Sequence, residues 1–191
     1  MTKIIDRIGK HPPPKYYRCQ RRIERITGIV LHQTGCAKSD RPESWDRLNA
    51  HYGTTPGGHI VLANAPKDFI WHAQGLSPST VGVEIAGNYP GFENEPSSLW
   101  KKGGPAAELT GDMIEAAHEL LDIILNDCPH IRHIYAHRQS YQNRANDPGY
   151  EIWQQIAIPW REFLDCPDSD LDKTWGKKKK GWKIPPEWRT K

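Results

Sequence analysis

The segment ITGIVLH, at residues 26–32, is rich in β-branched residues and predicts a strand. TVGVEIAG (80–87) and IRHIYAH (131–137) have the same character further along the chain, and HIVLA (59–63) and FIWH (69–72) are expected to be shorter strands. Strands that alternate with helical patterns are typical of a sheet covered by helices. The sequence therefore predicts an α/β fold: a single domain with a mixed central β-sheet flanked by α-helices.

Two helices are expected between these strands. The first starts at SDRP (39–42), because proline is favoured in the first helical turn, and Trp45, Leu48 and Tyr52 follow at helical spacing. The second begins after Thr110, whose side chain can cap it. Its apolar positions are Met113, Ile114, Ala117, Leu120, Leu121 and Ile124.

The length of the chain and the distribution of its charges indicate how it is divided into segments. Its 191 residues suffice for one domain with a hydrophobic core. The net charge of +3 is unevenly placed, because residues 1–25 carry eight Lys or Arg against two Asp or Glu, and residues 173–191 carry eight against one. We expect a basic N-terminal arm (1–25), a folded domain (26–165) and a basic, tryptophan-containing tail (166–191). The body between the basic ends is acidic and is not expected to bind nucleic acid.

Targeting signals are not apparent. No stretch approaches the roughly 20 apolar residues of a membrane span. The N-terminal sequence MTKIIDRIGKHPPPKYY lacks the uncharged apolar region of a signal peptide, so we expect synthesis in the cytoplasm without an export signal. The four cysteines form no CxxC pair and are expected to be free thiols.

Three residues of metal-binding type stand at or after strand ends. His32 closes the first strand, His137 closes the last, and Asp147 follows ten residues later in a loop. Two neutral imidazoles and a carboxylate suffice for a zinc site with a fourth position open to water. Such a zinc lowers the pKa of its water towards about 7, which suits amide hydrolysis. Structural roles are the alternative, because nine histidines make strand-end positions common and Asp-Pro-Gly is an ordinary turn.

A candidate general base lies on the strand at 80–87. Glu84 is on the strand face opposite to the valines, and its near neighbours on that face are Gly82 and Ala86. These small residues leave room for a metal, a water molecule and a substrate. Glu84 is therefore the predicted base.

In chain order, these motifs resemble the zinc-dependent N-acetylmuramoyl-L-alanine amidases, which share their fold with phage amidase endolysins and peptidoglycan-recognition proteins. The resemblance covers roughly residues 26–165. The matching segments are IVLHQTG (29–35), AHY (50–52), GHI (58–60), WHA (71–73), VGVEIAG (81–87), AH (136–137) and DPG (147–149).

The resemblance implies a role for each matching residue. It makes His32, His137 and Asp147 the ligands of one zinc ion per chain. Glu84 matches the glutamate that activates the zinc-bound water. The implied activity is that of a zinc hydrolase.

Two further positions bear on substrate binding and rate. By resemblance, Trp71 and His72 line the cleft next to the metal but outside its ligand shell, with core packing as the alternative for Trp71. Many family members carry a lysine two residues before the aspartate ligand, and here that position is Ala145. The adjacent Arg144 is predicted to replace this lysine in part as a catalytic residue, with real but modest activity.

These features predict an enzyme that cleaves the amide bond between N-acetylmuramic acid and L-alanine in peptidoglycan or soluble muropeptides. The alternative is a non-catalytic peptidoglycan-binding module on the same fold, which the intact ligand set disfavours. The expected site of action is the cell wall or periplasm, reached by a route other than Sec, as for a phage endolysin or a secreted antibacterial effector. Cytoplasmic muropeptide recycling is the other possibility, and the oligomeric state is left open.

Two segments are expected to modify this activity. Residues 89–109 follow the Glu84 strand and are expected to border the cleft with Tyr89, Phe92 and Trp100, or else to form a surface insertion. The tail at 173–191 is expected either to attract anionic envelope polymers or to pack its tryptophans across the domain.

Overall fold

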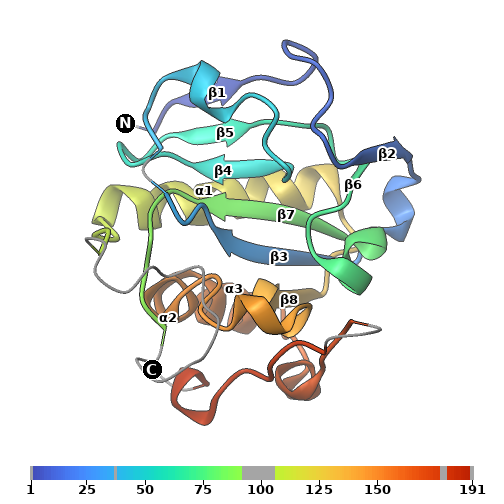
Figure 1. Ribbon diagram of the computed structural model, residues 1–191, viewed down its shortest axis with the longest axis vertical. Helices are drawn as coiled ribbons and strands as arrows, with labels where there is room; N and C mark the ends of the chain where they lie inside the picture. Colours follow the sequence, from blue (N-terminus) through green and yellow to red (C-terminus); the bar gives the residue numbers. More distant parts are fainter. Residues whose placement is uncertain (1, 37, 92–105, 177–179, 190–191) are drawn as a thin grey trace.

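Six strands form a mixed central sheet in the computed structural model of the chain (Figure 1). The structure describes residues 2–36, 38–91, 106–176 and 180–189. Only β4 and β5 pair antiparallel, and the other neighbours are parallel. In spatial order the strands are β1 (Ile4–Asp6), β5 (Ile60–Leu62), β4 (Tyr52–Thr54), β7 (Thr80–Ile85), β3 (Gly28–Gln33) and β8 (His133–Ala136). The predicted mixed sheet is therefore confirmed.

A second, two-stranded sheet pairs β2 (Tyr17–Gln20) antiparallel with β6 (Asp68–Ile70). Residues 1–25, expected to form an arm, thus contribute strands to both sheets. The buried side chain of Ile5 shows why, because β1 covers apolar surface at the β5 edge. Short apolar stretches in a charged segment carry little periodic signal, so the sequence did not reveal these strands.

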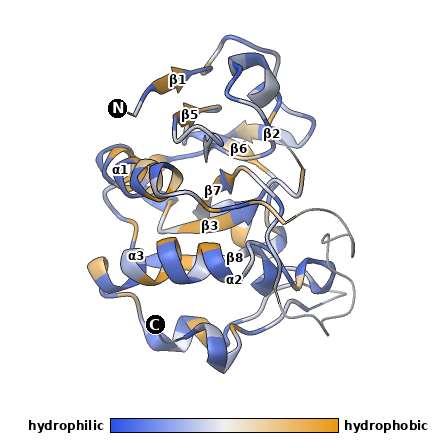
Figure 2. Cartoon of the chain, turned by 90° about the vertical axis from the view of Figure 1, so that its left-hand side faces the viewer, coloured by the Kyte–Doolittle hydropathy of each residue, from blue (hydrophilic) through white to orange (hydrophobic). Residues whose placement is uncertain are grey.

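The helix α1 (Gly111–Asp127) covers one face of the sheet (Figure 1). The Thr110 side chain accepts a hydrogen bond from the Met113 backbone N–H, which is the predicted N-cap. The apolar side of α1 is buried against the strands, and Figure 2 shows hydrophobic residues concentrated along β3, β7 and β8. The predicted second helix is therefore confirmed.

A continuous helical segment follows β8 and packs beside α1. It consists of α2 (Tyr150–Ile152), the π-helical η6 (Trp153–Ala157) and α3 (Ile158–Phe163). Trp160 Nε1 donates to His118 Nδ1 of α1 at 3.2 Å. The remaining helical turns are η1 (Ile23–Arg25), η2 (Pro42–Trp45), η3 (Gln74–Ser79), η4 (His137–Gln139), η5 (Gln142–Arg144), η7 (Asp168–Asp172) and η8 (Pro186–Trp188).

The helix expected from residue 39 to Tyr52 does not form. Only the turn η2 is helical, Arg47 takes a positive φ of 58°, and Tyr52 begins strand β4. The backbone N–H of His51 donates to the Gly82 carbonyl at 3.0 Å, so this segment pairs with β7 instead. Pairing with a distant strand overrides a local helical spacing.

The C-terminal tail packs across the domain. Trp188 is fully buried, and Trp175 lies against Tyr135 with ring centroids 4.8 Å apart. Trp182 is 37% exposed, and its Nε1 donates to the Gln142 carbonyl. Most of the lysine run falls outside the described residues, whereas two of the three tail tryptophans serve packing.

Two other expectations can be compared with the structure. All four cysteines are free. Within the described ranges, no helix has the length and apolar character needed to cross a membrane.

Candidate metal centre

Three neighbouring parallel strands bring the predicted site residues to one edge of the sheet. In the β3–β7 register His32 lies opposite Glu84, and in the β3–β8 register Leu31 lies opposite Ala136. His137 follows Ala136 directly, so its side chain meets that of His32. The register therefore converts three distant sequence segments into one cluster.

The side chains of His32, His137 and Asp147 converge and are all buried. Nδ1 of His137 lies 2.8 Å from Nδ1 of His32 and 2.8 Å from Oδ2 of Asp147. The other carboxylate oxygen of Asp147 accepts a hydrogen bond from the Gln33 backbone N–H at 2.9 Å. This bond ties the Asp147 loop to the end of β3.

This donor set fits a zinc ion. Two ring nitrogens and a carboxylate oxygen point at one another, so at most a shared proton satisfies their lone pairs, whereas a divalent cation satisfies all three. Burial and the neighbouring His137 lower the pKa of His32 well below its ordinary value. The imidazole is thus held in the neutral form that a metal ligand requires.

Glu84 stands beside this cluster with an uncommitted oxygen. Its Oε2 is shielded from solvent and has no hydrogen-bond partner among the described residues. Burial, together with the Asp147 carboxylate, raises the pKa of Glu84 to about 8. A carboxyl group in this environment exchanges protons near neutral pH, as a general base must.

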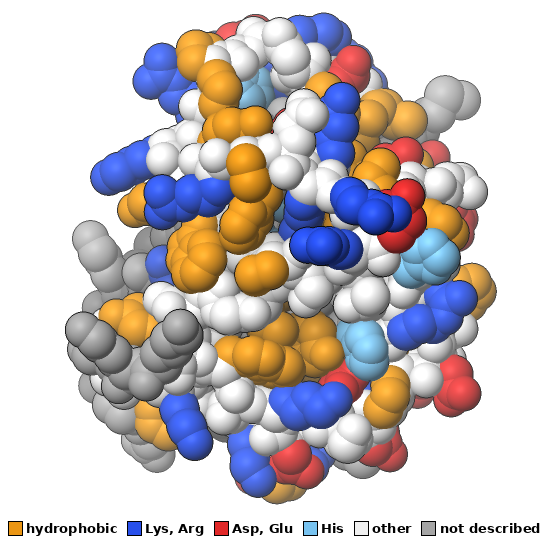
Figure 3. Space-filling model, turned by 90° about the vertical axis from the view of Figure 1, so that its right-hand side faces the viewer, with side chains coloured by type: hydrophobic (Ala, Val, Ile, Leu, Met, Phe, Trp, Pro, Cys, Tyr) orange, Lys and Arg blue, Asp and Glu red, His pale blue; other side chains and the backbone are white. Residues whose placement is uncertain are grey.

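Trp71 and His72 take different positions from one another. Trp71 is 38% exposed and lies near Phe69, with ring centroids 6.1 Å apart, so core packing does not explain it. It belongs to the β2–β6 side of the molecule, where Figure 3 shows Lys and Arg side chains next to hydrophobic ones. His72 is buried, and its Nδ1 lies 3.0 Å from Nε2 of His32. Sequence reasoning placed His72 near the metal but missed this contact.

Arg144 comes close to the cluster through a turn. It ends η5, and the Asp147 backbone N–H donates to its carbonyl at 2.9 Å. Its Nη1 lies 3.9 Å from Asp147 Oδ2. Ala145, which stands where the family often has lysine, is fully buried.

One more buried histidine lies beside the cluster. His51 accepts a hydrogen bond at Nδ1 from the Gly82 backbone N–H, and its Nε2 lies 2.8 Å from the Asp68 carbonyl. Its burial lowers its pKa to about 3. His51 holds β7 in place and is not part of the group formed by His32, His137 and Asp147.

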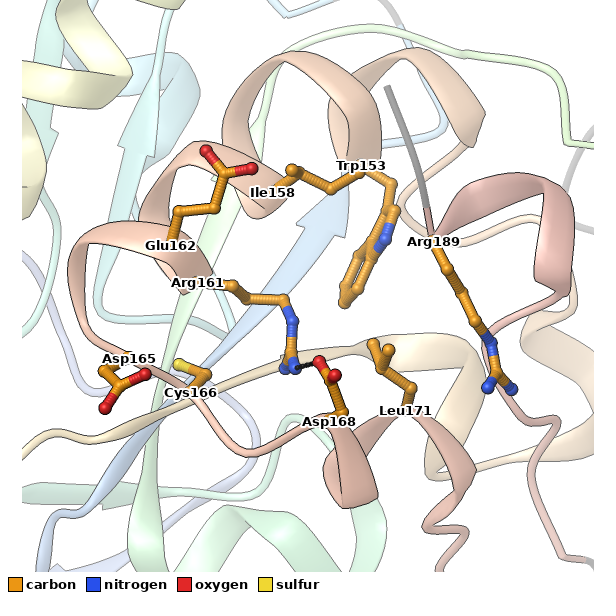
Figure 4. A pocket seen from close by; sticks show the side chains of 9 residues that line it. All are labelled: Trp153, Ile158, Arg161, Glu162, Asp165, Cys166, Asp168, Leu171 and Arg189. Carbon is orange, nitrogen blue, oxygen red and sulfur yellow. Dashed lines mark ion pairs between the residues drawn. The ribbon is translucent and has the colours of Figure 1, made fainter.

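A separate cavity of about 260 Å³ lies between α3 and the C-terminal segment (Figure 4). Arg161 and Asp168 face one another across it at 4.0 Å, and Arg189 borders it. None of the predicted site residues lines this cavity. The candidate metal centre is therefore at the sheet edge and not here.

The sheet and its helices define the fold that amidase endolysins share with peptidoglycan-recognition proteins. The chain belongs to the N-acetylmuramoyl-L-alanine amidase family, whose model matches residues 22–150. Tested against curated protein sequences, the chain gave no match.

Solved structures of similar fold come from phage, bacteria and insects. The Ph2119 endolysin from the Thermus scotoductus MAT2119 bacteriophage Ph2119 is 18% identical, with a TM-score of 0.58, over 81% of this chain and 97% of that one. The amidase LysC from Clostridium intestinale is 15% identical, with a TM-score of 0.56, over 87% and 100%. Drosophila PGRP-SD is 14% identical, with a TM-score of 0.58, over 90% and 100%. At these identities the likeness concerns the fold.

Proposed function

We propose that the protein is a zinc-dependent hydrolase that cleaves the amide bond between N-acetylmuramic acid and L-alanine in peptidoglycan or muropeptides. The observation that carries the proposal is the convergence of His32, His137 and Asp147 beside Glu84, whose Oε2 has no hydrogen-bond partner in the part of the chain that the structure describes. Membership of the amidase family supplies the substrate class.

His32, His137 and Asp147 would hold the ion, one per chain, and leave room for substrate on the Glu84 side. A zinc ion in this place would polarise the scissile carbonyl and lower the pKa of a water molecule towards about 7. Burial of the two imidazoles, and the hydrogen bond from the Gln33 backbone N–H to the Asp147 carboxylate, keep these side chains in place.

Glu84 moves the proton in this scheme. Its Oε2 takes a proton from the attacking water and passes it to the nitrogen of the leaving L-alanine as the carbon–nitrogen bond breaks. The products are a lactyl carboxylate and a free amine. Arg144 adds positive charge close to the developing oxyanion, in place of the absent lysine.

The test is mass spectrometry of purified sacculi and of soluble muropeptides after incubation with the zinc-loaded protein. Release of peptides with a free L-alanine amine supports the proposal, and the preferred substrate separates wall degradation from muropeptide recycling. Inactivity on both substrates by a zinc-loaded, folded protein would refute it. Trp71, exposed beside His72, is proposed to contact the substrate.

A second candidate function is binding of peptidoglycan without hydrolysis. The buried Ala145 favours it, because an alanine donates nothing to an oxyanion. Retention of the protein on sacculi without product release would support this function. The site of action is proposed to be the cell wall or periplasm, or the cytoplasm during muropeptide recycling.

A further inference from the structure

His72 makes a buried hydrogen bond with the candidate metal ligand His32, on the side of that ring away from the cluster. Nδ1 of His72 lies 3.0 Å from Nε2 of His32. The other ring nitrogen of His72, Nε2, faces Thr80, at 3.3 Å from its carbonyl oxygen and 3.4 Å from Oγ1. Each ring nitrogen of His72 thus has a definite neighbour.

The hydrogen-bond donors and acceptors that link Thr80, His72 and His32 determine which ring nitrogens carry protons. The Thr80 carbonyl only accepts, and the single hydroxyl proton of Thr80 is donated to the Leu76 carbonyl at 2.8 Å. Both Thr80 oxygens therefore act as acceptors, and Nε2 of His72 must carry a proton. A neutral His72 then presents a lone pair at Nδ1. Because this lone pair can only accept, Nε2 of His32 must carry the proton and donate it. Nδ1 of His32 is then unprotonated, and its lone pair faces His137 and Asp147.

We propose that His72 is a positioning residue that sets the tautomer and ring orientation of His32, through a relay that begins at the Thr80 carbonyl. The inference rests on the proposed function for the identity of the metal. A ligand histidine whose second nitrogen donates to a fixed acceptor is more basic at the metal and loses less rotational freedom on binding. His72 acts on the metal through His32 and does not touch it.

The surrounding backbone is built to admit the His72 ring. A Cβ added at Gly82 would come within 2.9 Å of His72 Nδ1. The backbone N–H groups of His72 and Ala73 both donate to Ser77 Oγ, at 3.0 and 2.7 Å, which fixes the backbone that carries the His72 ring. The absence of a side chain at Gly82 therefore makes room for the His72 ring to contact His32.

Two substitutions, each of which places an amide near one of the two ring nitrogens, separate positioning from packing. His72→Asn places an amide oxygen near the position of Nδ1 and keeps an acceptor for His32. His72→Gln places its amide near Nε2, where it reaches Thr80 but leaves His32 without an acceptor. Zinc affinity of the full chain is measured by chelator competition at one pH, and the melting temperature of each metal-free variant is recorded beside it.

We expect His72→Gln to weaken zinc binding by about 10–100-fold and His72→Asn to stay much closer to wild type, with similar melting temperatures for both. Equal zinc affinity in all three proteins would overturn the inference, as would equal losses that follow a fall in melting temperature. Long-range ¹H–¹⁵N spectra of the wild-type imidazoles provide a readout independent of the variants. A His32 with its proton on Nδ1 would also overturn the inference.

Failure of the His72 inference can be distinguished experimentally from failure of the proposed hydrolase function. Zinc affinity and tautomer are measured without substrate. A zinc-binding protein that obeys the His72 pattern but releases no L-alanine amine would refute the hydrolase and leave the positioning role intact. A wild-type chain that binds no zinc would refute both.

Discussion

Replacing Glu84 by Gln tests whether the buried Glu84 carboxyl group destabilises the metal-free fold. Burial and Asp147 raise the pKa of Glu84 from 4.5 to about 8. The folded state therefore holds a proton that the unfolded chain releases between these values. Stability contributed by the neutral acid is fully present below about pH 4.5 and is lost as the pH rises towards about 8.

The magnitude follows from the two pKa values. Each pH unit between them lowers the free energy of unfolding by about 1.4 kcal/mol. The metal-free protein should thus lose about 2–3 kcal/mol between pH 5 and pH 7 through Glu84 alone. Glutamine has nearly the shape of the protonated acid and does not titrate. The variant should therefore be of similar stability near pH 5 and about 2–3 kcal/mol more stable than wild type near pH 7.

The assay is urea unfolding with EDTA present, followed by the fluorescence of the eight tryptophans at several pH values. Buried histidines such as His32 and His51 titrate in the opposite sense, because their lowered pKa values make the fold gain stability as the pH rises. Both proteins share these groups, so the difference between the two unfolding free energies isolates Glu84.

A difference that stays constant from pH 5 to pH 8 would refute the reasoning, since it would mean that Glu84 is solvated and ionised in the fold. The same variant should lose about 10²–10⁴-fold in turnover when loaded with zinc, while binding the metal as wild type does. Greater stability with lower activity is the behaviour of a residue kept for function.

Three further predictions concern the ligands, the arginine and the tail. Asp147→Asn removes the anionic member of the cluster, so metal analysis should find well under one zinc per chain, and chelation of the wild type should abolish turnover reversibly. Arg144→Ala should lower kcat by about 10²-fold and Arg144→Lys by less, and equal kcat in all three proteins would exclude a role for this cation. Trp188→Ala should cost about 3–5 kcal/mol in urea unfolding because its ring is fully buried, whereas alanine at the exposed Trp182 should change stability far less.

The sequence predicted the mixed sheet and the convergence of His32, His137 and Asp147, because both depend on strands with strong local patterns. The alternation in residues 80–87 put Glu84 on the face that the structure turns towards His32. Local sequence patterns give the wrong secondary structure where pairing with a strand distant in the sequence determines the structure of a segment. Tyr52 fits a helical spacing but joins β7, and Ile5 stands in a charged segment but pairs with β5. The His72 contact was likewise out of reach, because no spacing encodes which two rings meet.

Two small residues on one face of the sheet explain how so many rings and charges fit around the site. Gly53 lies opposite Glu84 in the β4–β7 register, and a Cβ at Gly53 would collide with the ring of Trp45. A side chain at position 53 would therefore displace the fully buried Trp45, whose ring lies over the Gly53 backbone.

Gly82 has a similar role on β7, two residues before Glu84. It admits His72, as Gly53 admits Trp45, so two rings lie closer to the strand backbones than a residue with a Cβ would allow. His72, one of these two rings, contacts the candidate metal ligand His32 at 3.0 Å. The small residue at position 82 is thus a precondition for the polar contact between His72 and His32.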